Sequence, residues 1–313
     1  MSTILAFINS LPGAVGQGLA WGVMAIGVYI TYRILDIADL TVDGSLATGG
    51  AVCAIAITLG VNPWVAVMLA IMAGMLAGFV TGFFHTVCGI PAILSGILTQ
   101  LALYSLNLRI LAIGSDATTQ ATLPLSVDNQ HLLLSSRYIR ALALNNPIWL
   151  LLVVVLVVIG GLYWFFGTEL GSSLRATGAN PNMARAQGIN TNFSKVLALI
   201  VSNGLVALSG ALLAQYQGSA TVDMGRGAIV IGLAAVIIGE VVFKGFVNFA
   251  SKMTAVILGA IIYYVVITLV LRLGLESTDL KLLTALVVAA FLTVPYLMGK
   301  RHAKLKKGGP RNA

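Results

Sequence analysis

Three aspartates stand in a stretch that is otherwise rich in apolar residues. Asp36, Asp39 and Asp43 are three and four residues apart, a spacing that would align them on one face of a helix. Ionisable groups surrounded by apolar residues are costly and often functional. A structural interpretation is favoured, because Asp43 precedes Gly-Ser as an N-cap would and Asp36 can pair with Arg33. A gating role for these aspartates stays open.

Glu240 is the fourth acidic residue of interest, because it ends an apolar run. Lys244 follows four residues later, which is the favourable order for an i,i+4 ion pair. We therefore predict a structural bridge at Glu240, with a gating role as the alternative.

Motifs for other chemistry are missing from the sequence. It contains no GxxxxGK[ST] nucleotide loop, no HExxH or CxxC pair and no GxSxG elbow. We expect no metal site, no catalytic constellation and no cofactor on this chain. Any ATP and Mg²⁺ would have to be bound by another subunit.

The composition indicates what kind of secondary structure must position these residues. Of 313 residues, 58% are apolar and only 9% are charged, against roughly 25% in soluble domains. A polytopic all-α integral membrane bundle forming one domain, 1–313, follows from this. The net charge is +8, with six basic residues in the tail 300–313, which we interpret as a cytoplasmic anchor at anionic lipid and not as a nucleic-acid site. No basic residue precedes Arg33, so the first span should stay in the mature protein.

Apolar periodicity predicts eight or nine spans with discontinuous segments, since 44–60 and 228–243 are short enough to be re-entrant. Nine crossings and a cytoplasmic tail place the N-terminus outside, and the loops 114–146 and 217–227 with it. The predicted spans are 14–35, 44–60, 64–85, 91–112, 147–166, 195–216, 228–243, 253–272 and 281–299.

Two of these spans, 91–112 and 195–216, carry clusters of uncharged polar residues. In lipid such groups must find partners, so half or more should form hydrogen bonds between helices. The remainder is predicted to line a translocation path whose lack of fixed charge suits a zwitterionic solute. The candidates are Thr99, Gln100, Tyr104, Asn107, Ser202, Asn203 and Gln215.

Thr-Val-Asp occurs twice, at 41–43 and 221–223, each time before glycine and a short apolar helix. The two segments could be counterparts in an inverted repeat that opens from opposite membrane faces around a central site. Coincidence in a glycine-rich chain is the competing explanation.

The polar segment 167–195 lies between two strongly apolar runs and is the stretch around which the chain is organised. Asn180-Pro181 is a helix start, and Gly188 suits a left-handed C-terminal turn. The helix between them, 182–187, has about two turns and must lie against something, so we predict a docking helix. The candidate coupling residues are Arg175, Asn180, Pro181, Asn182, Met183, Ala184, Arg185, Ala186, Gln187 and Gly188.

The run GSSLRATGANPNMARAQGIN, followed by VDMGRGAIVIGLAAVIIGE, resembles the permease subunits of bacterial ABC importers of the branched-chain amino-acid type. The resemblance extends over 36–52 and 85–110 and is strongest to the tryptophan/tyrosine transport permeases. It implies that 179–190 contains a cytoplasmic coupling helix seated on an ATPase. It further implies a homodimer in the bacterial cytoplasmic membrane, a partner solute-binding protein and an aromatic or branched-chain amino acid as cargo.

Three alternatives remain. An ABC permease for another small solute would share every feature above. An ion-coupled secondary transporter would need an indispensable titratable residue, for which Asp36, Asp39 and Glu240 are the candidates. An intramembrane enzyme would need a nucleophile with a base or a metal pair, and no such set is found in the sequence.

Overall fold

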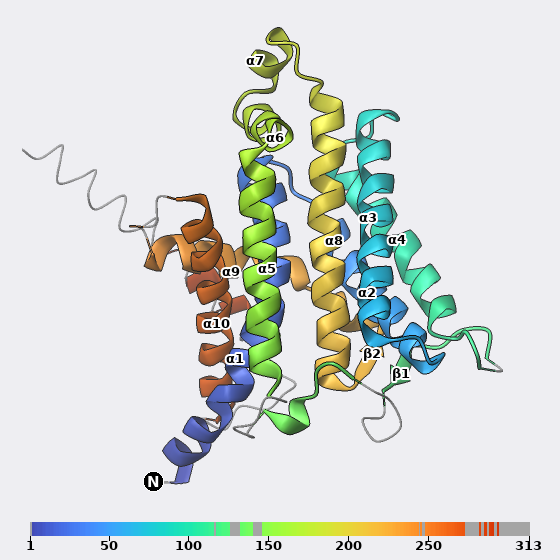
Figure 1. Ribbon diagram of the computed structural model, residues 1–313, viewed down its shortest axis with the longest axis vertical. Coiled ribbons are helices and arrows are strands. Elements are labelled where there is room, and N and C mark those ends of the chain that lie inside the picture. Colours follow the sequence, from blue (N-terminus) through green and yellow to red (C-terminus); the bar gives the residue numbers. More distant parts are fainter. Residues whose placement is uncertain are drawn as a thin grey trace, which may run out of the picture.

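The structure is a computed structural model that describes residues 2–115, 117–125, 132–139, 146–243, 245, 248–272 and scattered helical positions between 282 and 293. Nearly all of its elements are helices (Figure 1). They are α1 (Ser2–Tyr29), η1 (Ile30–Ile34), α2 (Thr41–Thr58), α3 (Pro63–Thr86), α4 (Ala92–Ile110), β1 (Thr122–Pro124), η2 (Ser136–Tyr138), α5 (Pro147–Gly167), α6 (Glu169–Ala179), α7 (Pro181–Ala186), α8 (Thr191–Gln217), β2 (Ser219–Thr221), η3 (Val222–Gly225), α9 (Ala228–Val242) and α10 (Phe249–Arg272).

Eight helical segments among the described residues are long and apolar enough to cross a membrane. They coincide with the first eight predicted spans, including the short ones, which here run through Thr41–Thr58 and Val222–Val242. The all-α membrane fold is therefore confirmed. The ninth predicted span, 281–299, and the basic tail fall mostly outside the described residues.

Asn-Pro pairs begin three of the helices. The side-chain oxygens of Asn62, Asn146 and Asn180 each accept a hydrogen bond from a backbone N–H in the first turn, at 3.0 Å, 3.0 Å and 3.1 Å. Proline follows at the first helical position, where its missing N–H leaves no hydrogen bond unmade. The starts of α3, α5 and α7 are thus encoded locally.

The centre of the bundle is α8, which packs against α1, α2 and α3. The glycine stripe of α3 makes this possible, because a Cβ at Gly74 would collide with Ala207 and one at Gly78 with the Leu199 carbonyl. A Cβ at Gly82 would lie 3.0 Å from Val196 Cα. Glycine at every fourth residue thus lets α3 and α8 approach closely.

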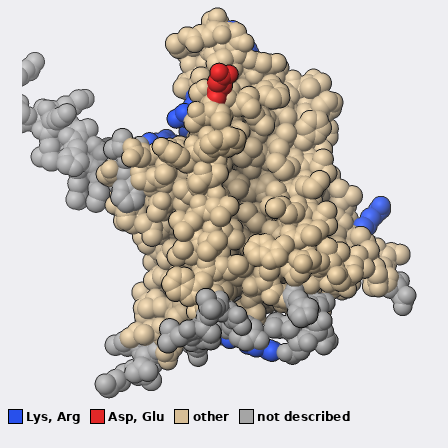
Figure 2. All heavy atoms as spheres, in the orientation of Figure 1, with Lys and Arg blue, Asp and Glu red and all other residues tan. Residues whose placement is uncertain are grey.

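Helix α5 shows how the bundle meets its surroundings. Its exposed Trp149 and Trp164 stand 15 positions apart, or about 22 Å along the helix axis. Tryptophan is enriched at both water interfaces of a membrane protein. Figure 2 agrees, because the visible face is nearly free of charged side chains between its two ends.

The two ends of the bundle differ. One carries α6 and α7 together with the end of α3 and the start of α8 (Figure 1). There Lys195 Nζ lies 3.4 Å from His85 Nε2. The other carries the start of α1 and the antiparallel pair β1–β2, in which Thr122 faces Thr221. This pair, which was not predicted, joins the long loop after α4 to the end of α8.

Candidate functional site

Helix α7 is short and has a defined stop at each end. Asn180 ends α6 and caps α7, accepting hydrogen bonds from the N–H groups of Asn182 and Met183 at 3.1 Å. At the other end Gly188 has φ +82°, and the Ile189 N–H donates to the Ala184 carbonyl at 3.0 Å. The helix begins and ends one residue earlier than the predicted 182–187, a shift within the usual uncertainty of helix ends.

The faces of α7 differ in exposure. Ala184 is buried, whereas Met183 is 60% exposed and available to a partner. Arg185 Nε donates to Thr191 Oγ1 at 2.8 Å, so this guanidinium is held against the start of α8. Pro181, Asn182, Ala186 and Gln187 are exposed. Met183 therefore projects from α7, whereas Arg185 is held against α8.

Helix α6 connects α7 to the bundle. Arg175 donates to the Phe166 carbonyl at 2.6 Å, which ties α6 to the end of α5. Gly178 packs so closely on the Ile34 carbonyl that no side chain would fit. Ile34 belongs to η1, a π-helical turn at the end of α1. Helix α6 therefore links α7 to the end of α1 by direct packing.

The three aspartates do not share a helix face, contrary to the alignment considered from their spacing. The chain leaves η1 before Asp36, which has φ +56°, and α2 begins only at Thr41. Asp39 accepts a hydrogen bond from the Thr41 N–H at 2.9 Å and thereby acts as the cap of α2. The cap expected at Asp43 lies four residues earlier.

Asp43 caps another helix. Its carboxylate accepts hydrogen bonds from the N–H groups of Gly227 and Ile229 at 3.0 Å each, at the start of α9. The prediction that Asp43 caps the helix following it in sequence was therefore wrong. Asp43 sits within α2 and accepts hydrogen bonds from N–H groups at the start of α9 that have no partner within that helix. The favourable position of a carboxylate at a helix N-terminus adds to this contact.

Asp43 also brings the two Thr-Val-Asp segments together. Gly225 packs directly on the Asp43 carbonyl. From this meeting point α2 runs toward the turn at 59–62, and α9 runs toward Arg33 at the end of α1. The two segments meet side by side but are reached from opposite ends of the bundle, because the first follows the end of α1 and the second follows the β1–β2 pair. Their superposition as repeats stays a prediction.

Glu240 pairs with Arg33, at 2.9 Å between Oε1 and Nε. The expected structural bridge at Glu240 is present, and among the described residues its partner is Arg33 at the end of α1. Lys244 lies outside the described residues. Since Arg33 bonds Glu240, the proposed Arg33–Asp36 pair is replaced by a contact between distant helices.

A buried polar network joins α2, α3, α4 and α8. Asn203 donates to Asp39 Oδ2 at 2.7 Å and accepts from Ser45 at 2.6 Å. The hydroxyls of Thr41, Thr81 and Thr99 follow one another at 2.8 Å and 2.9 Å. Asp39 is 3% exposed, and its burial raises the pKa of the carboxyl against the opposing effect of its hydrogen bonds.

Several predicted path residues are used in packing. Ser202 donates to the Gly27 carbonyl at 2.8 Å, and Gln215 accepts from the Leu133 N–H at 3.0 Å. Both are buried, as are Thr99 and Asn203. These four side chains bind other helices or loops, which agrees with the expectation that half or more would do so.

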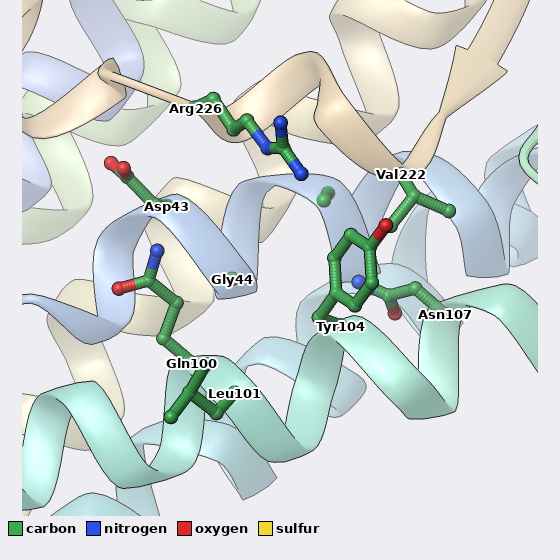
Figure 3. A pocket seen from close by; sticks show the side chains of 9 residues that line it. Asp43, Gly44, Gln100, Leu101, Tyr104, Asn107, Val222 and Arg226 are labelled. Atoms are coloured by element: carbon green, nitrogen blue, oxygen red, sulfur yellow. The ribbon is translucent and has the colours of Figure 1, made fainter.

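The other three path residues, Gln100, Tyr104 and Asn107, line one pocket of about 360 Å³. Figure 3 shows them on α4, facing Asp43 of α2 and Arg226 of the segment before α9. The sequence interpretation missed Arg226. A charged residue between two glycines in Met-Gly-Arg-Gly was the available signal.

The part of the chain that the structure describes contains no group of three His, Cys, Asp or Glu side chains placed to hold a metal ion. Cys53 is buried and Cys88 is exposed, and both are free thiols.

Residues 11–293 match the family described as "Branched-chain amino acid transport system / permease component". The chain belongs to this family. It is the membrane subunit of an ATP-binding-cassette transporter, a transport component and not an enzyme. Family membership therefore decides against the ion-coupled transporter and the intramembrane enzyme.

Individual relatives cover nearly the whole permease. A tyrosine transport system permease protein of Clostridioides difficile is 42% identical over 95% of this chain and 96% of its own length. A ribose import permease protein of Escherichia coli is 27% identical over 82% of this chain and 75% of its own length. The solved structure of PsaBC from Streptococcus pneumoniae in complex with Fab has a TM-score of 0.56 at 17% identity, covering 97% of this chain and 99% of that one, and supports the fold alone.

Proposed function

We propose that this permease imports an amino acid, using a partner ATPase that binds ATP and Mg²⁺ and a solute-binding protein outside the membrane. The observation that carries the cargo assignment is the 42% identity to a tyrosine transport permease over almost the full chain. The sugar permease is much more distant, at 27%. An aromatic or branched-chain amino acid is therefore favoured over a sugar.

The α7 helix is proposed to couple the permease to the ATPase. Its exposed Met183 offers an apolar anchor, and its capped ends keep it rigid. Through α6, the contact of Gly178 with Ile34 connects α7 to α1. Closure of the ATPases on ATP would thus move the end of α1 without an intervening flexible segment.

The topology follows from this role. If α7 faces the cytoplasm, so does the turn at 87–91, and the start of α1 and the β1–β2 pair face outward. We propose a cytoplasmic C-terminal tail from its six basic residues. The loops 114–146 and 217–227 are then placed to receive the binding protein. We further propose that two copies assemble as a homodimer in the bacterial cytoplasmic membrane, with the pore between protomers.

Reconstitution tests the cargo and the energy source together. The permease is placed in proteoliposomes with its ATPase and binding protein, and uptake of labelled L-tyrosine and L-leucine is measured with and without ATP. We expect saturable uptake of at least one amino acid that requires ATP and both partners. Uptake without the ATPase, or uptake of ribose but of no amino acid, contradicts the proposal.

Met183 tests the coupling role. Met183→Ala removes the anchor of α7, and loss of one buried apolar anchor at an interface should lower solute-stimulated ATPase activity about ten-fold. Met72→Ala on α3 is the matched control, because Met72 is 59% exposed against 60% for Met183. Arg185→Glu should uncouple as well, by reversing charge on the same helix. Normal coupling in both α7 variants, in correctly folded protein, contradicts the assignment.

A further inference from the structure

The pocket between α2, α4 and the loop before α9 holds groups of opposite charge. Asp43 and Arg226 both line it, and the Asp43 carboxylate is fixed by its bonds to Gly227 and Ile229. A carboxylate has about four acceptor positions, so two backbone N–H bonds leave it able to accept more. The Arg226 guanidinium pairs with Asp223 at 2.8 Å, and both side chains are 59% exposed. Exposed pairs of this kind are weak and exchange partners easily.

The same pocket contains an unsatisfied amide. Asn107 is 1% exposed, and neither its Nδ2 nor its Oδ1 has a hydrogen-bond partner. Buried polar side chains in proteins are nearly always hydrogen-bonded. An amide that lines a cavity with both groups unmet is therefore ready to bind a polar group that enters.

Apart from the Gln100 amide, the remaining lining is apolar and aromatic. Tyr104 presents its ring below the Arg226 guanidinium, whose Cζ lies 5.7 Å from the ring centroid (Figure 3). Leu101 and Val222 complete this wall. A volume of about 360 Å³ is at the small end of small-molecule sites, the size range of a single metabolite.

We propose that this pocket is a transient subsite for the zwitterion of an aromatic amino acid on its way through the permease. The carboxylate would bind Arg226 in place of Asp223, the ammonium would face Asp43, and the side chain would lie along Tyr104 toward Asn107. This inference rests on the proposed import of amino acids and adds where the cargo is bound. A sugar carries no charge and would leave both ionic groups unused.

Binding is tested by protection of a thiol at the pocket. Leu101→Cys, made together with Cys88→Ser, places a reactive thiol on the exposed pocket wall, since the remaining Cys53 is buried. The probe is L-phenylalanine, compared with phenethylamine, which lacks the carboxylate, and 3-phenylpropionate, which lacks the ammonium. L-Phenylalanine should slow alkylation at concentrations about ten-fold lower than either analogue, because each analogue loses one charge-assisted contact.

Arg226 provides the decisive variant. Arg226→Gln should weaken protection by L-phenylalanine about ten-fold, to the level of phenethylamine. Arg109→Gln is the control, because Arg109 is an exposed arginine of α4 that does not line the pocket. Asn107→Leu should weaken protection by L-tyrosine, whose hydroxyl can bond the amide, and leave protection by L-phenylalanine unchanged. It should not unfold the protein, since the amide makes no bond that leucine would break. The thermal midpoint of each purified variant checks the fold.

The outcomes separate this inference from the proposed function. The subsite inference is overturned if Arg226→Gln leaves protection unchanged, or if all three probes protect equally. If ATP-dependent amino-acid uptake persists in the same variant, the proposed import function still stands. Charge-dependent protection without any ATP-dependent uptake supports the subsite and contradicts the proposed function. Protection that is absent in the parent protein overturns the inference.

Discussion

The two Thr-Val-Asp segments have the same three residues and opposite uses. Asp43 is partly buried and caps a helix that starts 185 positions later in the chain, at Ala228. Asp223 lies in the turn η3, is 59% exposed and pairs with its neighbour Arg226. The same three-residue motif thus provides a helix cap between distant segments in one place and a solvated ion pair in the other. The local residues set the helix starts, and the surroundings decide what the carboxylate does.

The largest expected effect comes from removing the structural carboxylate. Asp43→Ala leaves the N–H groups of Gly227 and Ile229 without acceptors in a partly buried site, which should destabilise the fold by about 2 to 3 kcal/mol. Thermal or denaturant unfolding of the purified permease measures this. If Asp43→Ala lowers the free energy of unfolding by less than Asp223→Ala does, the cap contributes little.

Steric separation of the two segments should have the next largest effect. Gly225→Ala places a methyl group on the Asp43 carbonyl and should cost about 1 to 3 kcal/mol. Gly161→Ala is the control, because a Cβ there meets nothing within 4 Å and alanine is the better helix former. That control should be neutral or stabilising by up to about 1 kcal/mol. Equal effects of the two substitutions on the unfolding midpoint contradict the close contact.

The smallest effect is expected at the exposed pair. Asp223→Asn removes one partner of a solvated ion pair and should change the free energy of unfolding by less than about 0.5 kcal/mol. The same change frees Arg226, so protection of the pocket thiol by L-phenylalanine should improve. Unchanged protection, together with unchanged stability, would mean that Asp223 does not compete for Arg226.

Features encoded by near neighbours could be predicted from the sequence. The eight spans, the glycine stripe of α3 and the capped helix from Asn180 to Gly188 all follow from periodicity or from adjacent residues. Partners across the fold could not be predicted this way. Glu240 bonds Arg33, which lies 207 positions away in the chain. Asp43 likewise matched a local cap and serves a distant helix.

The candidate path was predicted only by residue type. Polar residues on two helices were expected to divide between packing and path lining, but sequence alone did not say which residues would pack. Ser202 and Gln215 find bonding partners, whereas Asn107 does not, and that depends on neighbouring backbone in three dimensions. Arg226 was missed because its role requires the loop to fold back over α4.

The Asn-Pro starts of α3 and α5 have a consequence for the lipid around them. Each fixes the first residue of a span by a side chain and a ring, independently of the bilayer. Such a helix cannot lengthen its start to match a thicker membrane. Hydrophobic mismatch must then be absorbed by tilting of the helix or by local deformation of the lipid. The lengths of these two spans should therefore stay constant when the acyl chains of the surrounding lipid are lengthened or shortened.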